Sequence, residues 1–107
     1  MTTDLTSTAD LQRLPHIEQR LEQLLQDRRS ILAELEPRAL PTVDPVAYQT
    51  AATHRRVIAQ LADALDRLRA GTYGTCVRCG ESIAPARLEA IPHAAACIRC
   101  QNHAEAA

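Results

Sequence analysis

Two Cys-x-x-Cys pairs near the C-terminus constrain this chain more than any other feature. Cys76 and Cys79 form the first pair, Cys97 and Cys100 form the second, and the sequence contains no other cysteine. Paired knuckles at this spacing bring four thiolates onto one tetrahedral Zn²⁺ ion. Catalytic zinc keeps an open position for water, and four cysteine ligands leave none. The pattern therefore predicts one structural zinc and no enzymatic chemistry at the metal.

The same cysteines could instead form disulfides or a redox pair. Residues 1–10 are polar and carry no apolar signal-peptide core, so we expect a cytoplasmic protein with reduced thiols. No stretch approaches about 18 uninterrupted apolar residues, so we expect no membrane span. A thioredoxin-like pair belongs with a βαβ pattern, which is missing here. Zinc is favoured over both alternatives, and we expect the nearby His93 and His103 to be surface residues rather than ligands.

Apolar residues before the cysteines follow two helical seams with alternating steps of three and four. The first seam comprises Leu14, Ile17, Leu21, Leu24, Arg28, Ile31 and Leu35, with Leu25 and Leu32 widening it to one side. The second comprises Ala47, Ala51, His54, Ile58, Leu61, Leu65 and Leu68. Three prolines between the seams, at positions 37, 41 and 45, interrupt the helical pattern. Two such helices joined by a short turn predict an antiparallel coiled-coil hairpin, better packed at its base than at its alanine-rich tip.

These signals predict a mainly α-helical chain in three parts. We expect a flexible N-terminus over residues 1–9, a helical hairpin over 10–70 with its tip near 37–45, and a C4 zinc-finger module over 71–107. The first helix begins near Asp10 or near Pro15, and the second runs from about Pro45 to Ala70, where Gly71 ends it. In the module we expect a short helix between the knuckles and a small apolar cluster covered by Tyr73. The expected members of this cluster are Val77, Ile83, Leu88, Ile91 and Ile98.

Charge and composition bear on whether the zinc finger binds nucleic acid. The formal net charge is −1, all 12 basic residues are arginine, and phenylalanine and tryptophan are absent. Three arginines follow Arg69, and three glutamates offset them. A nucleic-acid-binding module normally shows a basic face and stacking aromatics. A nucleic-acid-binding zinc finger is therefore the least favoured function, and a zinc-stabilised adaptor for another protein is a better alternative.

The predicted hairpin tip carries the candidate partner-binding residues. Asp44 and Pro45 suit the N-cap and first position of the second helix. An acid at the exposed end of a long arm could also meet a cation or a basic partner. Arg55 and Arg56 follow on the second helix and make residues 37–56 net positive. We take Asp44, Ala47, Arg55 and Arg56 as the candidate contact residues.

The C-terminal half also carries a family resemblance. The residues concerned are ALDRLRAGTYGTC at 64–76, CGESI at 79–83, RLEAIP at 87–92 and CIRCQ at 97–101. Over about residues 64 to 101 this resembles the DksA/TraR C4-type zinc-finger family, and the preceding hairpin agrees in kind. The resemblance implies a bacterial transcription regulator that binds RNA polymerase without contacting promoter DNA specifically. It also implies a zinc module at the rim of the polymerase's secondary channel and a hairpin inserted into that channel.

The tip departs from the pattern typical of this family. Members with full activity show Asp-x-x-Asp-x-Ala, and some act together with guanosine tetraphosphate. Here Asp44 matches the first aspartate, whereas Ala47 replaces the second and Gln49 replaces the alanine. The resemblance therefore supports polymerase binding. It gives less support to an effect on transcription or a response to guanosine tetraphosphate.

Overall fold

The structure of this chain is a computed structural model that describes residues 8–106. Four α-helices and one 3-10 turn follow in order: α1 Thr8–Leu35, η2 Glu36–Arg38, α2 Pro45–Ala70, α3 Pro85–Ala90 and α4 Ile98–Ala106. Most of the expected flexible N-terminus lies outside the described residues, while Thr8 and Ala9 belong to α1. The described part contains no strand, only an isolated bridge between Thr75 and Ser82. The mainly α-helical class predicted from the sequence is confirmed.

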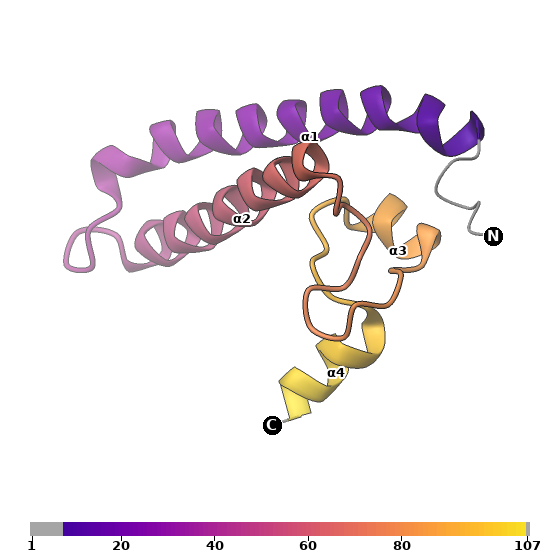
Figure 1. The fold of residues 1–107 in the computed structure, drawn as a ribbon. Coiled ribbons are helices and arrows are strands. Elements are labelled where there is room, and N and C mark those ends of the chain that lie inside the picture. The colour runs from indigo at the N-terminus through magenta and orange to yellow at the C-terminus, as the bar shows by residue number, and fades with distance from the viewer. Residues whose placement is uncertain (1–7, 107) are drawn as a thin grey trace.

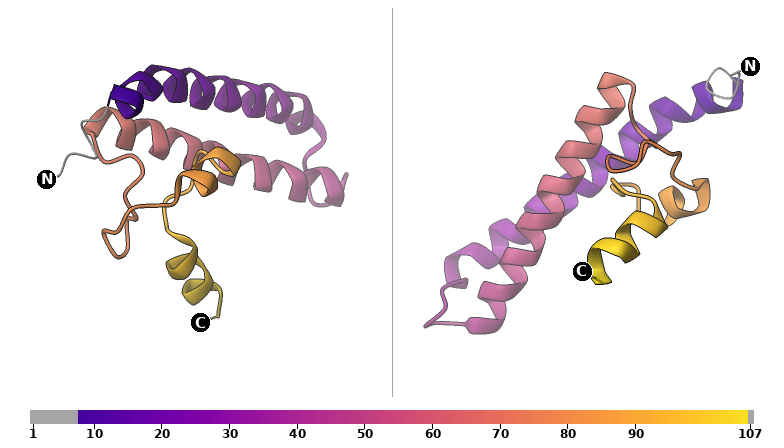
Figure 2. Two further views of the ribbon diagram at one scale, coloured as in Figure 1. Left: turned by 90° about the vertical axis from the view of Figure 1, so that its right-hand side faces the viewer. Right: turned by 60° about the horizontal axis from the view of Figure 1, so that its bottom comes forward.

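Helices α1 and α2 lie side by side as an antiparallel hairpin (Figure 1). The loop that joins them forms the free end of an elongated molecule, whose principal extents are 58 × 34 × 21 Å. The zinc module, residues 71–106, lies beside the other end of the hairpin, and α4 projects away from it (Figures 1 and 2). None of the described helices is long and apolar enough to cross a membrane. The arrangement separates the tip from the cysteines along the length of the arm.

Local capping explains where α2 begins and ends. Asp44 is the N-cap in an extended conformation, and its Oδ1 accepts the backbone N–H of Ala47 at 3.0 Å. Pro45 occupies the first turn, where a missing N–H costs nothing. At the other end Gly71 adopts φ 83°, and its N–H meets the carbonyls of Arg67 and Leu68. The predicted helix from Pro45 to Ala70 is confirmed.

The hairpin core is concentrated near the zinc module. Its buried members are Leu21, Leu25, Leu61, Ala64 and Leu65. Toward the tip the buried hydrophobic side chains are alanines, at positions 39, 47 and 51. Large aliphatic side chains bury far more apolar area than alanine, so the base contributes most of the hairpin's hydrophobic stabilisation. The predicted difference in packing between base and tip is confirmed.

The first seam is rotated slightly from the predicted one. Ile31 is 44% exposed, whereas Leu25 is buried and Leu32 is half-buried. The side that was expected only to widen the seam therefore forms part of its centre. At mid-length the seams meet through polar groups, because Nη1 of Arg28 lies 3.2 Å from Nδ1 of His54 on α2. This polar pair takes the place of an apolar contact between α1 and α2, at the boundary between the leucine-rich base and the alanine-rich tip.

The zinc module has a small core of its own. Cys76, Ile83 and Ala96 are buried together, and Leu88, Cys97 and Cys100 pack against them. Two expected members of this cluster, Val77 and Ile98, are exposed instead. They follow the first cysteine of each pair, so turning the sulfurs inward leaves these neighbouring side chains facing outward. So small a cluster gives the module little hydrophobic stabilisation, and a metal ion is needed to hold it together.

Candidate functional site

The first cysteine pair lies on a tight backbone turn. The N–H groups of Arg78 and Cys79 point at Sγ of Cys76, at 3.4 and 3.5 Å. The N–H of Gly80 donates to the carbonyl of Cys76 at 3.0 Å, and Gly80 adopts φ 78°. Only glycine enters that left-handed region without strain. The turn thus presents backbone donors to a sulfur that carries negative charge when it binds a metal.

The second pair lies where α4 begins. The N–H of Gln101 donates to the carbonyl of Cys97 at 2.9 Å, which starts the helix between the two cysteines. Two further contacts fix this segment. The N–H of Val77 donates to Ala95 at 2.9 Å, and Nε of Arg87 donates to Ala96 at 3.1 Å. These bonds connect the first pair and α3 to the residues that precede the second pair.

The four cysteines meet at one point. Their sulfur atoms all lie within 4.8 Å of one another, and Sγ of Cys79 is 3.9 Å from Sγ of Cys97. Zinc bound at about 2.3 Å from each sulfur gives tetrahedron edges of about 3.8 Å. The cluster therefore fits one four-coordinate ion, and the bound ion would have no free position for a substrate or water. It is the only group of possible metal ligands among the described residues.

The thiols differ in acidity because their surroundings differ. The N–H of Cys79, followed by further backbone donors, lowers the pKa of Cys76 to about 6. Hydrogen bonds to the thiols of Cys97 and Cys79 raise the pKa of Cys100 to about 12. Four neighbouring thiols cannot all ionise together without a cation, because each thiolate disfavours the next. A divalent metal removes that conflict by binding all four as thiolates.

Three side chains hold the zinc module against the hairpin: Arg20 and Arg67 belong to the hairpin, and Tyr73 belongs to the start of the module. The hydroxyl of Tyr73 donates to Pro92 at 2.9 Å, Arg20 donates to Glu89 at 2.9 Å, and Arg67 reaches Ala94 at 3.5 Å. All three acceptors are backbone carbonyls of residues 89–94. Tyr73 packs on the hairpin core, so the expectation that it covers the module's own cluster is wrong. Its ring and hydroxyl instead join the two parts.

His93 lies in the same contact region. It is half-buried, not a surface residue as expected, and its buried Nδ1 has no hydrogen-bond partner among the described residues. Burial lowers the pKa of His93, and the charges of Arg28 and Arg67 lower it further. A neutral ring therefore suits this position. His103 is exposed on α4, and neither histidine joins the cysteine cluster.

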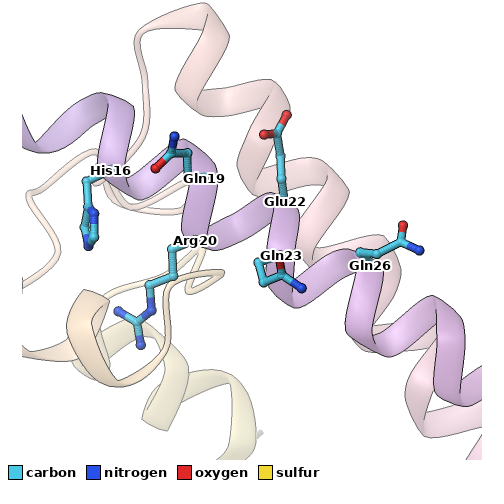
Figure 3. A pocket seen from close by; sticks show the side chains of 6 residues that line it. All are labelled: His16, Gln19, Arg20, Glu22, Gln23 and Gln26. Carbon is cyan, nitrogen blue, oxygen red and sulfur yellow. The ribbon is translucent and has the colours of Figure 1, made fainter.

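A shallow, open hollow lies along the outer face of α1, close to the zinc module (Figure 3). Its lining is entirely polar: His16, Gln19, Arg20, Glu22, Gln23 and Gln26. Arg20 is committed to the carbonyl of Glu89, and the hollow has no enclosed apolar wall. Small-molecule sites are normally concave and mostly apolar. This hollow is therefore a poor candidate for a substrate site.

At the hairpin tip, the proposed contact residues do not form one cluster. Asp44 caps α2 and also pairs with Arg38 at 3.6 Å, while the side chain of Ala47 is buried beneath it. Arg55 pairs with Glu36 at 3.5 Å. Glu36 lies just outside residues 37–56, and counting it lowers the net charge of this end from +2 to +1. Arg56 is exposed one position further along.

The tip also exposes apolar side chains that the sequence-based selection of contact residues missed. Leu40, Val43 and Val46 are 53, 64 and 75% exposed. A signal was present in the sequence, because aliphatic residues occur between prolines where a solvated loop would normally be polar. Tyr73, Arg20 and Arg67 were also missed as joining residues. Their partners are backbone carbonyls, which leave no pattern in the sequence.

Comparison with known proteins adds to this geometry. Residues 71–106 match the prokaryotic dksA/traR C4-type zinc finger family. These residues of the chain form a zinc finger of that family. The four neighbouring sulfur atoms and the family match together identify one structural zinc site in this DksA/TraR-type finger.

Three matches illustrate how far the similarity extends. An uncharacterized protein of Aquifex aeolicus is 48% identical over 42 residues, which are 39% of this chain and 29% of that protein. The RNA polymerase-binding transcription factor DksA of Caulobacter vibrioides is 36% identical over 74 residues, covering 68% of this chain and 52% of that protein. The chain thus spans about half or less of these relatives. Transcription factor DksA2 from Pseudomonas aeruginosa shares the fold, with a TM-score of 0.74, 21% identity, and coverage of 94% of this chain and 88% of that one.

Proposed function

We propose that this chain is a bacterial transcription regulator that binds RNA polymerase and has no enzymatic activity of its own. The zinc module would lie at the rim of the polymerase's secondary channel, and the hairpin would enter the channel tip first. Cys76, Cys79, Cys97 and Cys100 would hold the zinc. In this arrangement the metal has a mechanical role, because it fixes the module that positions the arm.

One observation carries the proposal most directly. The match to the Caulobacter RNA polymerase-binding factor covers 74 residues, whereas the zinc-finger family match covers residues 71–106. An alignment of that length cannot fit beyond residue 70, so it includes part of the hairpin. A zinc finger of this family attached to an unrelated protein would be similar to the relative in the finger alone, and not in the hairpin. The combination of both parts favours the function printed for the relative.

The charge distribution agrees with a protein partner rather than DNA. The formal net charge is −1, and the ion pairs of the hairpin join α1 or η2 to α2 or its cap. One example is Arg69, which pairs with Glu18 and Glu22 at 3.3 Å. Arginines paired within the fold are not available to neutralise DNA phosphates. We therefore infer that promoter DNA is not contacted specifically.

The test uses the whole purified chain and purified bacterial RNA polymerase. We expect the two proteins to co-migrate in gel filtration and this chain to compete with another secondary-channel factor for the enzyme. Promoter DNA without polymerase serves as the control and should not be retained. Co-migration without competition would place the protein elsewhere on the enzyme. Absence of both would favour a zinc-stabilised adaptor for a different protein.

A further inference from the structure

The free end of the hairpin is unusually apolar for an exposed loop. Three of the seven exposed large hydrophobic side chains in the described part lie within residues 40–46, namely Leu40, Val43 and Val46. Single exposed aliphatic residues are common on protein surfaces, but a group at one projecting end indicates a contact surface. We call these three side chains the apolar tip. Figure 1 shows the loop between η2 and α2 at the free end of the arm, and Val46 belongs to the first turn of α2.

The acidic group at this end is already engaged within the fold. One carboxylate oxygen of Asp44 accepts the N–H of Ala47, and the other lies 3.6 Å from Arg38. The neighbouring Glu36 is paired with Arg55. Binding a partner through the carboxylate of Asp44 would require giving up the cap or the ion pair. The apolar side chains require no such exchange, so the tip has a charge-balanced, aliphatic face to offer.

The backbone holds this face in a defined shape. The N–H groups of Val43 and Asp44 both donate to the carbonyl of Leu40, at 3.1 and 3.0 Å. The first of these bonds closes a four-residue turn and brings Leu40 and Val43 close together. Prolines at positions 41 and 45 restrict the backbone further. A rigid turn loses little conformational entropy when it binds, which favours its use as a contact.

The size of the apolar tip bears on the kind of partner that it can contact. A stable protein interface takes about 20–30 residues from each partner. Residues 40–46 are too few to hold two copies of this chain together by their tips. A small convex surface instead suits a narrow recess in a larger protein that is held by other contacts as well. The absence of a free charge on the tip indicates that this recess is apolar.

We propose that the apolar tip inserts into a narrow apolar recess of the protein that receives the hairpin. This rests on the proposed function, in which that protein is RNA polymerase. The tip then contributes to binding through Leu40, Val43 and Val46, and Asp44 contributes by shaping the turn. The carboxylate of Asp44 is a cap and an internal ion-pair partner in this proposal, not a contact with the polymerase.

The experiment measures the concentration of each variant that half-displaces a competing secondary-channel factor from RNA polymerase. The test variants are Val43→Ser with Val46→Ser, and separately Leu40→Ser. The matched control is Ile31→Ser, an exposed aliphatic residue of α1 outside the tip. Asp44→Asn tests the carboxylate while keeping the cap. Because the exchanged side chains are exposed, each variant should keep the wild-type thermal transition.

We expect the double variant to bind about tenfold more weakly or worse, since centrally placed interface side chains contribute at that level. Leu40→Ser should weaken binding in the same direction, while Ile31→Ser and Asp44→Asn should bind like the wild type. The ratio of wild-type to double-variant affinity should not change with salt, because apolar contacts are not screened.

Several results would overturn the proposal. Wild-type binding by both tip variants would show that the apolar tip makes no contact, while leaving the proposed function intact. Equal weakening by Ile31→Ser would place the contact outside the tip. A large loss in Asp44→Asn alone would assign the contact to the carboxylate. Failure of the wild-type chain to bind polymerase at all would instead remove the proposed function on which the inference rests.

Discussion

The two ends of the hairpin differ in what they bury and in what they expose. At the base, leucines from α1 and α2 form a closed core. Tyr73 of the zinc module packs against this core, and Arg20 of α1 donates to Glu89 of the module. At the tip the buried side chains are alanines, and aliphatic side chains face the solvent. The base therefore supplies stability. The tip is held by turn geometry and capping, which leaves its side chains available for a partner.

The largest expected effect follows from removing a cysteine at the base. Cys79→Ser leaves three thiolates, and because metal binding supplies folding energy in modules of this kind, zinc should be lost. Residues beyond Tyr73 should then unfold, while the hairpin core of leucines keeps most of the helical signal. Metal analysis and amide hydrogen exchange measure the two effects.

Ser82→Ala, an exposed exchange near the same turn, is the control and should retain zinc. If Cys79→Ser kept one zinc per chain and an unchanged thermal transition, the structural-metal assignment would be wrong. If the hairpin unfolded together with the module, the base would depend on the metal as well as on its leucines. The stability of the base would then come from the metal as well as from leucine packing, and the contrast between base and tip would be smaller than the packing indicates.

A smaller but still large effect is expected from the hairpin core itself. Leu61→Ala removes a fully buried side chain, and such changes lower the free energy of unfolding by about 2–5 kcal/mol. Val46→Ala at the tip, where the side chain is 75% exposed, should change it by less than about 0.5 kcal/mol. Denaturant unfolding followed by circular dichroism compares them. Similar losses from both variants would contradict the division between base and tip.

Much of this fold could be predicted from residue spacing. Steps of three and four place apolar side chains on one face of a helix, and Asp44, Pro45 and Gly71 define the bounds of α2 by their backbone and capping preferences. The cysteine spacing predicted the cluster, because a tetrahedral ion demands four nearby sulfurs. These are local rules, and they act over a few residues.

The contacts between the parts could not be predicted in this way. Tyr73 was expected on the wrong side because both packing partners are apolar, and only the direction of the chain after Gly71 decides between them. His93 was expected at the surface, since polarity alone does not show that the segment after α3 lies against the hairpin. Both errors concern long-range geometry. The apolar tip is a different case, because its aliphatic residues beside prolines were a local signal, and the charges of Asp44 and the arginines were given more weight.

The smallest expected effect separates the two roles of Asp44 at the tip. Asp44→Ala removes the acceptor for the N–H of Ala47 and should lower the free energy of unfolding by about 1 kcal/mol. Asp44→Asn keeps an oxygen acceptor and loses only the exposed pair with Arg38, which contributes about 0–1 kcal/mol and less at high salt. Urea unfolding at low and high salt measures both variants. If asparagine cost as much as alanine at low salt and nothing at high salt, the ion pair rather than the cap would hold the tip in shape.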